Sequence, residues 1–229
     1  MHIVSFSGGK DSTAMLIEML ERNMQVDRIV FADTKFEFPE MYDYINKVDK
    51  YIKRYGDYNI EIIRTDDTLE NWALGKITRG PLKGEIRGWP LVAHPCYWSR
   101  ESKYKLLERE MKGHIRYIGI ALDEKKRMVK DYYNRGYRYP LIEWGWTEQD
   151  CIDYLKKKDL HNPLYDKFDR TGCWWCPKQS LKSIEILIND YPDKWEKVKE
   201  LDNKIKELQS NRQFKPNVTL KELEDRFKR

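Results

Sequence analysis

The feature that most constrains this chain is a junction near its N-terminal end, where a strand pattern changes to a helix pattern through two adjacent glycines. Residues 2–6 form a short apolar run that stops at Ser7-Gly8-Gly9, as is typical of a buried strand followed by a tight turn. Apolar residues at helical spacing follow and predict a helix that begins near Ser12. A strand that leads directly into a helix is the building block of an α/β sheet.

The alternation of strands and helices continues along the chain. Residues 27–33 are predicted to form a second strand that ends in a carboxylate, and Pro39 opens a second helix where its missing N–H costs nothing. Residues 59–63 predict a third strand, and this order is typical of a doubly wound, mostly parallel sheet. Later elements are expected as a strand at 116–121 and as helices at 101–111, 180–210 and 146–158, the last capped by Thr147.

We therefore expect a Rossmann-like α/β domain in residues 1–180 and a helical C-terminal appendage in residues 181–229. A length of 229 residues suits one sizeable domain with an appendage. The chain is 40% hydrophobic, but 13% of its residues are aromatic, and Trp and Tyr supply buried area that argues against disorder.

Several classes of protein are excluded by composition. No apolar run approaches the roughly 18 residues of a membrane span, and the first residues lack the basic patch and apolar stretch of a signal peptide. Four cysteines in a chain of this length do not make a disulfide framework. We expect a cytoplasmic protein with no membrane partner.

The net charge of +5 is unevenly distributed. Residues 76–138 hold 16 Lys and Arg against 7 Asp and Glu. Such a basic stretch indicates an anionic ligand such as a nucleotide, a sulfonucleotide or RNA. A solvated surface with lysines on its outer face is the alternative interpretation.

The hexapeptide from Ser7 to Ser12 has the composition of a phosphate-binding loop. It lies where free backbone N–H groups and the helix dipole favour an anion, and its glycines let the backbone approach phosphate oxygens. Ser7, Ser12 and Thr13 offer hydroxyls and Lys10 a positive charge, whereas Asp11 next to phosphates calls for a bridging Mg²⁺. The Walker pattern is absent.

Ser-Gly-Gly-Lys-Asp-Ser in this context resembles the PP-loop of the adenine nucleotide alpha-hydrolase superfamily, whose members cleave ATP between the α and β phosphates. The rest of the chain resembles the phosphoadenosine phosphosulfate (PAPS) reductase-like family, which implies a PP-loop (HUP-type) fold. Four further segments carry this resemblance: residues 33–40 (with Lys35 where Gly is usual), 119–124 followed by Arg127, 139–144 as a late strand, and 162–166 as a loop.

The resemblance and the position of these residues imply their roles. Lys10, Asp11 and Arg127 are the expected catalytic residues, although Arg127 could also be a helix-surface charge. The expected nucleotide-binding residues are Ser5, Ser7, Gly8, Gly9, Lys10, Asp11, Ser12, Asp33, Thr34 and Gly119. The expected substrate-binding residues are Arg100, Lys103, Asp123, Glu124 and Arg127, whose cations would meet phosphate or sulfate oxygens.

The cysteines form a second candidate site. Cys173-Trp174-Trp175-Cys176 is a C-x-x-C motif, and Cys96 lies 77 residues before Cys173. In the sulfonucleotide reductases that this chain resembles, a Cys-Cys pair and a later C-x-x-C hold a 4Fe-4S cluster, but Tyr97 replaces the second Cys here. Three ligands remain, for a cluster with one open iron or for zinc, unless the site only staples the loop. Cys151 is a buried structural thiol or a fallback fourth ligand.

Three functions follow as hypotheses. The leading one is an ATP-dependent sulfurtransferase that adenylates an acceptor, releases pyrophosphate and inserts sulfur from the iron-sulfur cluster. Lys10 favours a full triphosphate, and no cysteine follows Cys176 to act as the tail cysteine of the family's reductases. The second is a sulfonucleotide (APS or PAPS) reductase that uses an external thiol. The third is a nucleotide- or RNA-binding module without turnover.

The expected partners follow from these hypotheses. They are ATP with Mg²⁺, an acceptor that is a small molecule or tRNA, a protein that donates sulfur or electrons, and a second copy of the chain in a homodimer.

Overall fold

The computed structural model describes residues 1–208, 210 and 212–228. The chain folds into two compact units, each assembled from separate stretches of sequence. The first unit contains Met1–Asp33, Phe38–Arg64 and Lys105–Thr171, and the second contains Thr34–Glu37, Thr65–Tyr104 and Gly172–Arg229. The helical residues after 180 therefore belong to the same unit as residues 65–104.

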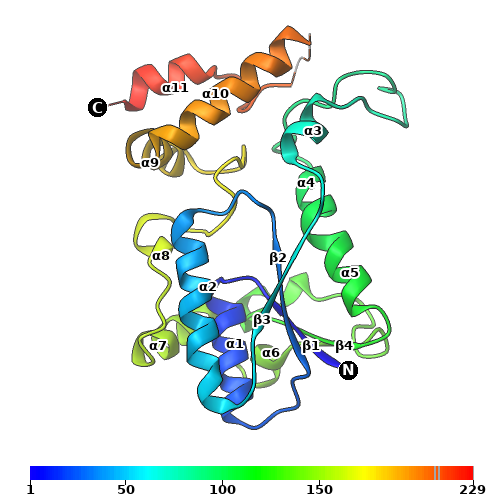
Figure 1. Cartoon of the computed structure of the whole chain (residues 1–229), viewed down its shortest axis with the longest axis vertical. Coiled ribbons are helices and arrows are strands. Elements are labelled where there is room, and N and C mark those ends of the chain that lie inside the picture. Colours follow the sequence, from blue (N-terminus) through cyan, green and yellow to red (C-terminus); the bar gives the residue numbers. More distant parts are fainter. Residues whose placement is uncertain (209, 211, 229) are drawn as a thin grey trace. The chain divides into compact units, whose positions relative to one another are not determined.

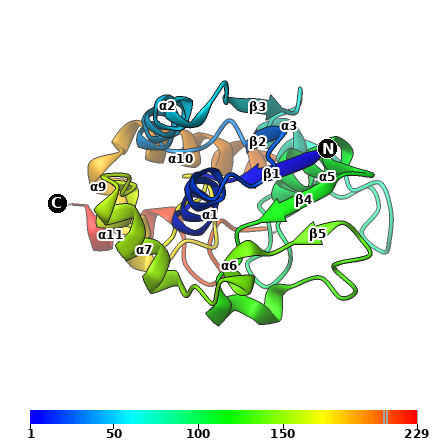
Figure 2. The same cartoon turned by 90° about the horizontal axis from the view of Figure 1, so that it is seen from below.

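A five-stranded parallel sheet forms the centre of the first unit. Its strands are β1 (His2–Phe6), β2 (Arg28–Asp33), β3 (Ile60–Arg64), β4 (Ile115–Ile118) and β5 (Tyr137–Arg138). They lie in the order β3-β2-β1-β4-β5, and each neighbouring pair is parallel (Figure 2). The predicted doubly wound α/β fold is confirmed, although β5, only two residues long, was not expected from the sequence.

The direction of the crossovers decides which helices cover each face of the sheet. α1 (Lys10–Glu21) connects β1 to β2, and α2 (Pro39–Ile52) connects β2 to β3. Both connections run toward the β3 edge of the sheet, so the two helices lie on the same face. The chain then returns past β1 to β4, which puts α5 (Lys105–Met111) on the other face (Figure 2). The order reverses between β1 and β4, so their carboxyl ends border the crevice where such sheets bind ligands.

Three helices follow β5 in the first unit: α6 (Pro140–Glu143), α7 (Glu148–Lys157) and α8 (Leu164–Lys167). α7 begins as predicted, with Thr147 as its N-cap in a capping box with Asp150, and it packs along α1. The late strand expected at 139–144 is wrong. Pro140 occupies the first turn of α6, where a proline is favourable, and the Trp144 amide donates to its carbonyl at 2.8 Å.

The second unit is mainly helical (Figure 1). Its helices are α3 (Leu69–Leu74), α4 (Tyr97–Ser99), α9 (Leu181–Asp190), α10 (Pro192–Glu207) and α11 (Leu220–Phe227). The single helix predicted at 180–210 is divided, because Pro192 begins a new helix and cannot continue the hydrogen bonds of α9. The helix predicted at 101–111 is likewise interrupted: a π-helical turn over Arg100–Tyr104 precedes α5.

Aromatic residues build the core of the second unit. Trp89 is fully buried and packs edge-to-face on Phe214, with ring centroids 4.9 Å apart. Its indole Nε1 donates to the buried Asp202 carboxylate of α10 at 2.8 Å. Residues 65–104 and α10 therefore share one core, and the high aromatic content of the sequence is used here.

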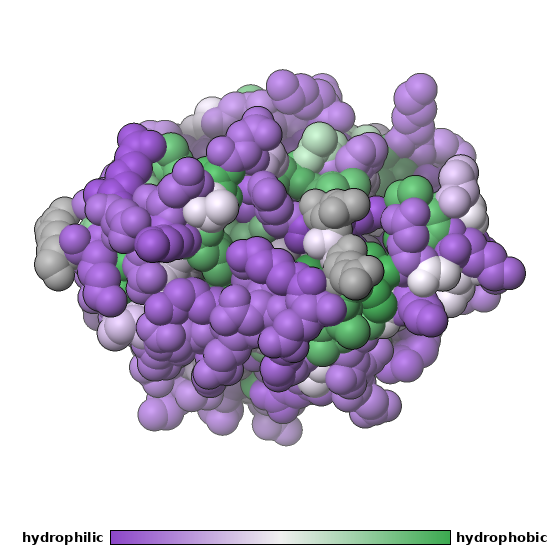
Figure 3. Space-filling model, turned by 90° about the horizontal axis from the view of Figure 1, so that it is seen from above, coloured by the Kyte–Doolittle hydropathy of each residue, from purple (hydrophilic) through white to green (hydrophobic). Residues whose placement is uncertain are grey.

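Hydrophilic residues dominate the face of the molecule in Figure 3, with only small hydrophobic patches between them. In the described part of the chain, no helix is both long enough and apolar enough to cross a membrane.

Candidate nucleotide and thiol sites

The loop between β1 and α1 has a conformation that requires glycine at position 8. Gly8 has φ +71°, and a Cβ on it would lie 2.4 Å from the sulfur of Met41, so a side chain there would be both strained and obstructed. Gly9 is the N-cap of α1 and provides no side-chain cap. Gly9 therefore leaves the first-turn N–H groups of the helix without a side-chain cap. An anion can bind at a helix start only where such N–H groups remain accessible.

Several backbone amides of this loop donate hydrogen bonds to hydroxyl groups. The Ser7 amide donates to Ser12 Oγ at 3.1 Å and the Gly9 amide to Ser7 Oγ at 3.3 Å, while the Lys10 amide donates to Tyr165 Oη at 3.2 Å. Ser12 Oγ also donates to the Gly9 carbonyl at 3.1 Å, and Thr13 Oγ1 does so at 2.9 Å. Ser12 and Thr13 are buried, so their hydroxyls brace the loop.

The loop after β4 packs directly onto the start of α1. Gly119 follows β4, and a Cβ on it would lie 2.7 Å from Ser12 Cα and 2.8 Å from Ser12 N. No side chain fits in that space without moving the backbone of the phosphate loop. Gly119, predicted as a nucleotide-binding residue, thus lies against this loop at the switch point of the sheet.

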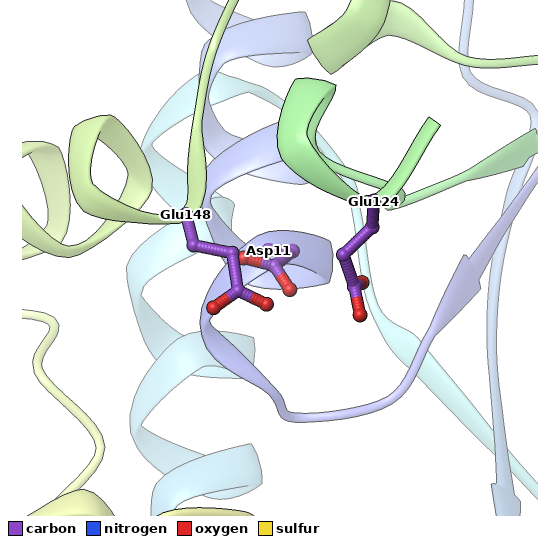
Figure 4. Close-up of side chains that lie close together, drawn as sticks. All are labelled: Asp11, Glu124 and Glu148. Atoms are coloured by element: carbon purple, nitrogen blue, oxygen red, sulfur yellow. The ribbon is translucent and has the colours of Figure 1, made fainter. Parts of the chain in front are cut away.

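Three carboxylates converge beside the loop (Figure 4). Asp11 comes from the first turn of α1, Glu124 from the 3-10 turn Leu122–Arg127 and Glu148 from the first turn of α7. One oxygen from each lies within 4.8 Å of the others. The Lys10 ammonium lies 3.2 Å from Glu148 and 3.6 Å from Asp11.

Burial and neighbouring charges shift the pKa values of Asp11 and Lys10. Burial raises the pKa of Asp11 to about 6, and Glu148 and Glu124 add to this shift while Lys10 opposes it. Burial by itself would lower the pKa of Lys10, but Asp11, Tyr165 and Glu148 raise it. Lys10 is therefore charged at neutral pH and partly neutralises the carboxylates.

A divalent cation suits these residues chemically. Asp11 Oδ1 is buried and has no hydrogen-bond partner, which is costly for a carboxylate oxygen. Mg²⁺ prefers one or two carboxylates together with phosphate oxygens. Asp11, with Glu124 and Glu148, could hold such an ion beside a phosphate on the loop.

The other nucleotide-site residues predicted in the first unit have varied surroundings. Ser5 is half-buried on β1, between β2 and β4. Asp33 is buried at the end of β2, where Tyr42 Oη donates to one oxygen at 2.9 Å and Arg64 Nε to the other at 2.7 Å. Both oxygens of Asp33 are thus already hydrogen-bonded.

Residues expected to meet the substrate are mostly engaged with neighbours. Arg127 pairs with Glu124, and its side chain is 57% exposed. Asp123 accepts from the Glu148 amide at 3.3 Å. In the second unit, Arg100 is 67% exposed and pairs with Glu101 at 3.3 Å.

Thr34 and Lys103 meet at a buried carboxylate in the second unit. Thr34 Oγ1 donates to Glu37 Oε1 at 2.8 Å, and Lys103 Nζ lies 3.0 Å from the same oxygen. Thr34 and Glu37 are buried. Lys103 thus neutralises Glu37, which was not singled out from the sequence although it lies in the segment 33–40.

Three cysteines line one cavity of about 360 Å³ in the second unit: Cys96, Cys173 and Cys176. Thr34, Lys103 and Lys178 line the same cavity. Cys96 and Cys173, which are 77 positions apart in sequence, thus line the same cavity. Tyr97, which replaces a second cysteine, instead donates to the Gly88 carbonyl at 2.7 Å.

The thiols differ in acidity. Burial raises the pKa of Cys96. A hydrogen bond from Cys173 lowers the pKa of Cys176 to about 7 despite its burial, with help from Lys178 and Lys215, whereas the same bond and burial raise that of Cys173. Cys176 is therefore the thiol most readily converted to a thiolate.

The donor set fits a cluster that takes three protein thiolates. Cys96, Cys173 and Cys176 would hold it, and when bound it would supply redox chemistry. In the described chain, these three sulfurs do not form a group in which all ligand atoms lie within 4.8 Å. A tetrahedral zinc with Zn–S bonds of about 2.3 Å needs sulfurs only about 3.8 Å apart, so zinc would require the thiols to move closer together.

Cys151 belongs to the other unit. It lies in α7, is fully buried, and its pKa is raised mainly by burial. Such a thiol is a packing residue.

Glu148 and Tyr165 were given no role from the sequence, although both border the phosphate loop. Glu148 directly follows the correctly predicted cap Thr147, but only the packing of α7 on α1 places it beside Lys10. Tyr165 lies in the family segment 162–166. The resemblance therefore included this residue, but it did not indicate that its hydroxyl contacts the Lys10 amide.

Comparisons with known proteins agree with this fold and loop. The phosphoadenosine phosphosulfate reductase domain matches residues 1–79. An adenosine 5'-phosphosulfate reductase of Staphylococcus haemolyticus is 30% identical over 184 residues, which are 76% of this chain and 69% of that protein. The chain belongs to the PAPS reductase-like family of the adenine nucleotide alpha-hydrolase superfamily.

Other relatives are longer. An uncharacterized protein of Methanocaldococcus jannaschii is 28% identical over 85% of this chain but only 40% of its own length, and the adenosine 5'-phosphosulfate reductase of Staphylococcus saprophyticus is matched over 65% of its length. The PAPS reductase of Candida auris, solved as a phosphate complex, superposes with a TM-score of 0.50 at 17% identity, covering 76% of this chain and 82% of that one. This last likeness concerns the fold.

Proposed function

We propose that this protein is a sulfonucleotide reductase that acts on an adenosine phosphosulfate. The supporting observation is the three-thiol cavity in a chain whose relatives are named adenosine 5'-phosphosulfate reductases. The amides of the phosphate loop and Lys10 would bind the nucleotide phosphate.

The reaction balances with an external dithiol. The bond between the sulfate sulfur and the phosphate oxygen breaks, and two thiols are oxidised to one disulfide. Sulfite leaves together with AMP when the substrate is adenosine 5'-phosphosulfate, or with adenosine 3',5'-bisphosphate when it is PAPS. The electron donor would be a small dithiol protein. Lys10 would stabilise the negative charge on the departing phosphate, which is the electrostatic contribution expected of such a group.

A second candidate is the ATP-dependent sulfurtransferase. The observation that favours it is Asp11, whose buried Oδ1 has no hydrogen-bond partner and whose carboxylate lies close to those of Glu124 and Glu148. A cation there would suit a triphosphate. An acceptor oxygen, on a small molecule or tRNA, would attack the α phosphate and release pyrophosphate, and sulfide would then displace AMP.

One preparation tests both functions. The reductase predicts sulfite and AMP from adenosine 5'-phosphosulfate, or sulfite and adenosine 3',5'-bisphosphate from PAPS, with a dithiol as reductant. The sulfurtransferase instead predicts AMP and pyrophosphate from ATP, Mg²⁺ and an acceptor. Lys10→Ala should reduce either activity by about 10² to 10³. Cys176→Ser should abolish sulfite release, and Cys151→Ser is the matched control.

Binding of ATP or RNA without any product would overturn both enzymatic functions and favour a binding module. The predicted homodimer is a separate proposal that sedimentation of the same preparation would test.

A further inference from the structure

Tyr165 differs from the other hydroxyls that occupy the phosphate loop. Ser7 and Ser12 belong to the loop itself, but Tyr165 lies 155 residues away in sequence from Lys10, whose amide it accepts from at 3.2 Å. A backbone amide at this position is one of the donors that an anion at a helix start would use. The Tyr165 hydroxyl therefore occupies the place of an anion oxygen.

The contact is built by the surrounding segment. Asn162 is buried, its Nδ2 donates to the Gly8 carbonyl at 2.9 Å, and its Oδ1 accepts from the Leu164 amide at 3.0 Å. Asn162 thus fixes the segment to the same turn that Tyr165 reaches. A Cβ on Gly9 would lie 3.3 Å from Tyr165 Oη. The absence of a side chain at Gly9 therefore gives the hydroxyl room to approach the loop.

Lys10 is held by the same ring. Its Nζ lies 5.5 Å from the centroid of Tyr165, within the range of a cation–π contact. Tyr165 Oη has a weak second contact, 3.5 Å from Thr171 Oγ1. The tyrosine therefore contacts both the amide and the side chain of the lysine expected to bind phosphate.

Space for the tyrosine to move lies next to it. A cavity of about 420 Å³ is lined by Tyr165, Lys10 and Asn162, together with apolar residues of α7. A hydrogen bond from an amide to an anionic oxygen is about twice as strong as one to a neutral hydroxyl. An incoming phosphate or sulfate oxygen can therefore displace the hydroxyl, but it must first break the existing bond.

We propose that Tyr165 is a residue of the anion site whose hydroxyl competes with the bound phosphate or sulfate group for the Lys10 amide. It holds the loop in shape when no ligand is bound and lowers the affinity for any anion that uses this amide. This inference rests on the proposed function, because it requires that the loop bind an anion.

Titration with inorganic pyrophosphate at saturating Mg²⁺, followed by calorimetry, tests the competition. Tyr165→Phe keeps the ring but removes the hydroxyl, so it should bind pyrophosphate about two- to tenfold more tightly than the wild type. Tyr154→Phe is the matched control, because its hydroxyl donates to Glu21 at 2.7 Å on the surface and its loss should leave affinity unchanged.

The NMR resonance of the Lys10 amide distinguishes loss of this hydrogen bond from a general packing defect, which would shift many amide resonances together. It should shift in ligand-free Tyr165→Phe relative to wild type, with most other amides unchanged. Equal or weaker pyrophosphate binding by Tyr165→Phe, while the wild type binds, would overturn the competition and leave the proposed function intact. If the wild type binds neither pyrophosphate nor a nucleotide, the anion site itself fails, and both proposals are rejected.

Discussion

At the scale of single residues, the loops that follow β1 and β4 contain positions where no larger side chain fits. Gly8 and Gly119 are glycines because a Cβ would collide with Met41 in one case and with the backbone of Ser12 in the other. Lys35 has φ +66°, which explains why glycine is usual at this position in the family segment. Asp11 is confined differently, by burial among like charges.

Gly119→Ala should destabilise the protein by about 1 to 3 kcal/mol, because the loop before α1 must shift to admit the new Cβ. Nucleotide binding should weaken as well, since the shifted backbone carries the amides that we propose bind phosphate. Chemical denaturation and nucleotide titration measure the two effects. Gly172→Ala is the control, as a Cβ there meets nothing within 4 Å; equal stability of both variants would contradict the packing argument.

Asp11 should make stability depend on pH when no divalent cation is present. Its pKa is about 6 in the folded chain and about 3.9 when unfolded, so the folded state binds the extra proton between these values. The free energy of unfolding should therefore decrease as pH rises from about 4 to about 6. Asp11→Asn should remove this component and raise stability at pH 7 by about 1 to 3 kcal/mol.

Denaturation curves of wild type and Asp11→Asn across this pH range measure the difference, with the exposed Asp153→Asn as control. Mg²⁺ should stabilise the wild type and have no effect on Asp11→Asn. A wild-type slope that equals that of Asp11→Asn would show that the carboxylate is not strained by its surroundings.

At the scale of elements, the two candidate sites form in different ways. The phosphate loop is local, because a strand, two glycines and a helix are consecutive in sequence. The thiol cavity combines α4, which starts after Cys96, with the C-x-x-C turn before α9. Consecutive residues therefore predicted the loop itself, whereas the link between Cys96 and the C-x-x-C motif came only from the family resemblance.

Substitution of single cysteines should separate cluster ligands from packing residues. Cys96→Ser, Cys173→Ser and Cys176→Ser should each lower iron and acid-labile sulfide in protein purified without oxygen, because each removes one thiolate ligand. Cys151→Ser should keep the metal content, since Cys151 is buried in α7 of the other unit. Visible absorption and metal analysis measure the content; an equal loss in all four variants would point to unfolding.

At the scale of the whole molecule, the two units are interleaved along the chain. The second unit takes its residues from three stretches, so it cannot be removed as a simple tail. Its core joins Trp89 to Asp202 and Phe214. The basic stretch 76–138 is likewise divided between both units, which a charge profile along the sequence cannot reveal.

A chain ending at residue 180 should lose the fold of residues 65–104. Trp89 would lose its ring contact with Phe214 and the hydrogen bond from its indole N–H to Asp202. An unpaired buried donor by itself lowers the free energy of unfolding by about 1 to 3 kcal/mol. Limited proteolysis and tryptophan fluorescence, compared with the full chain, measure this loss. If residues 65–104 of the shortened chain stay as protected as in the full chain, residues 181–229 are an independent appendage.

The sequence by itself determined most of the parallel sheet, the glycine turn between β1 and α1 and the cap of α7, because hydrophobic period, glycine position and capping act over a few neighbouring residues. The tertiary structure alone decided that Glu124 and Glu148 face Asp11, that Glu37 binds Lys103 and that Tyr165 occupies the Lys10 amide. These pairs are brought together by crossovers and helix packing over long stretches of chain. Their contacts depend on side-chain direction and burial, which no local pattern encodes.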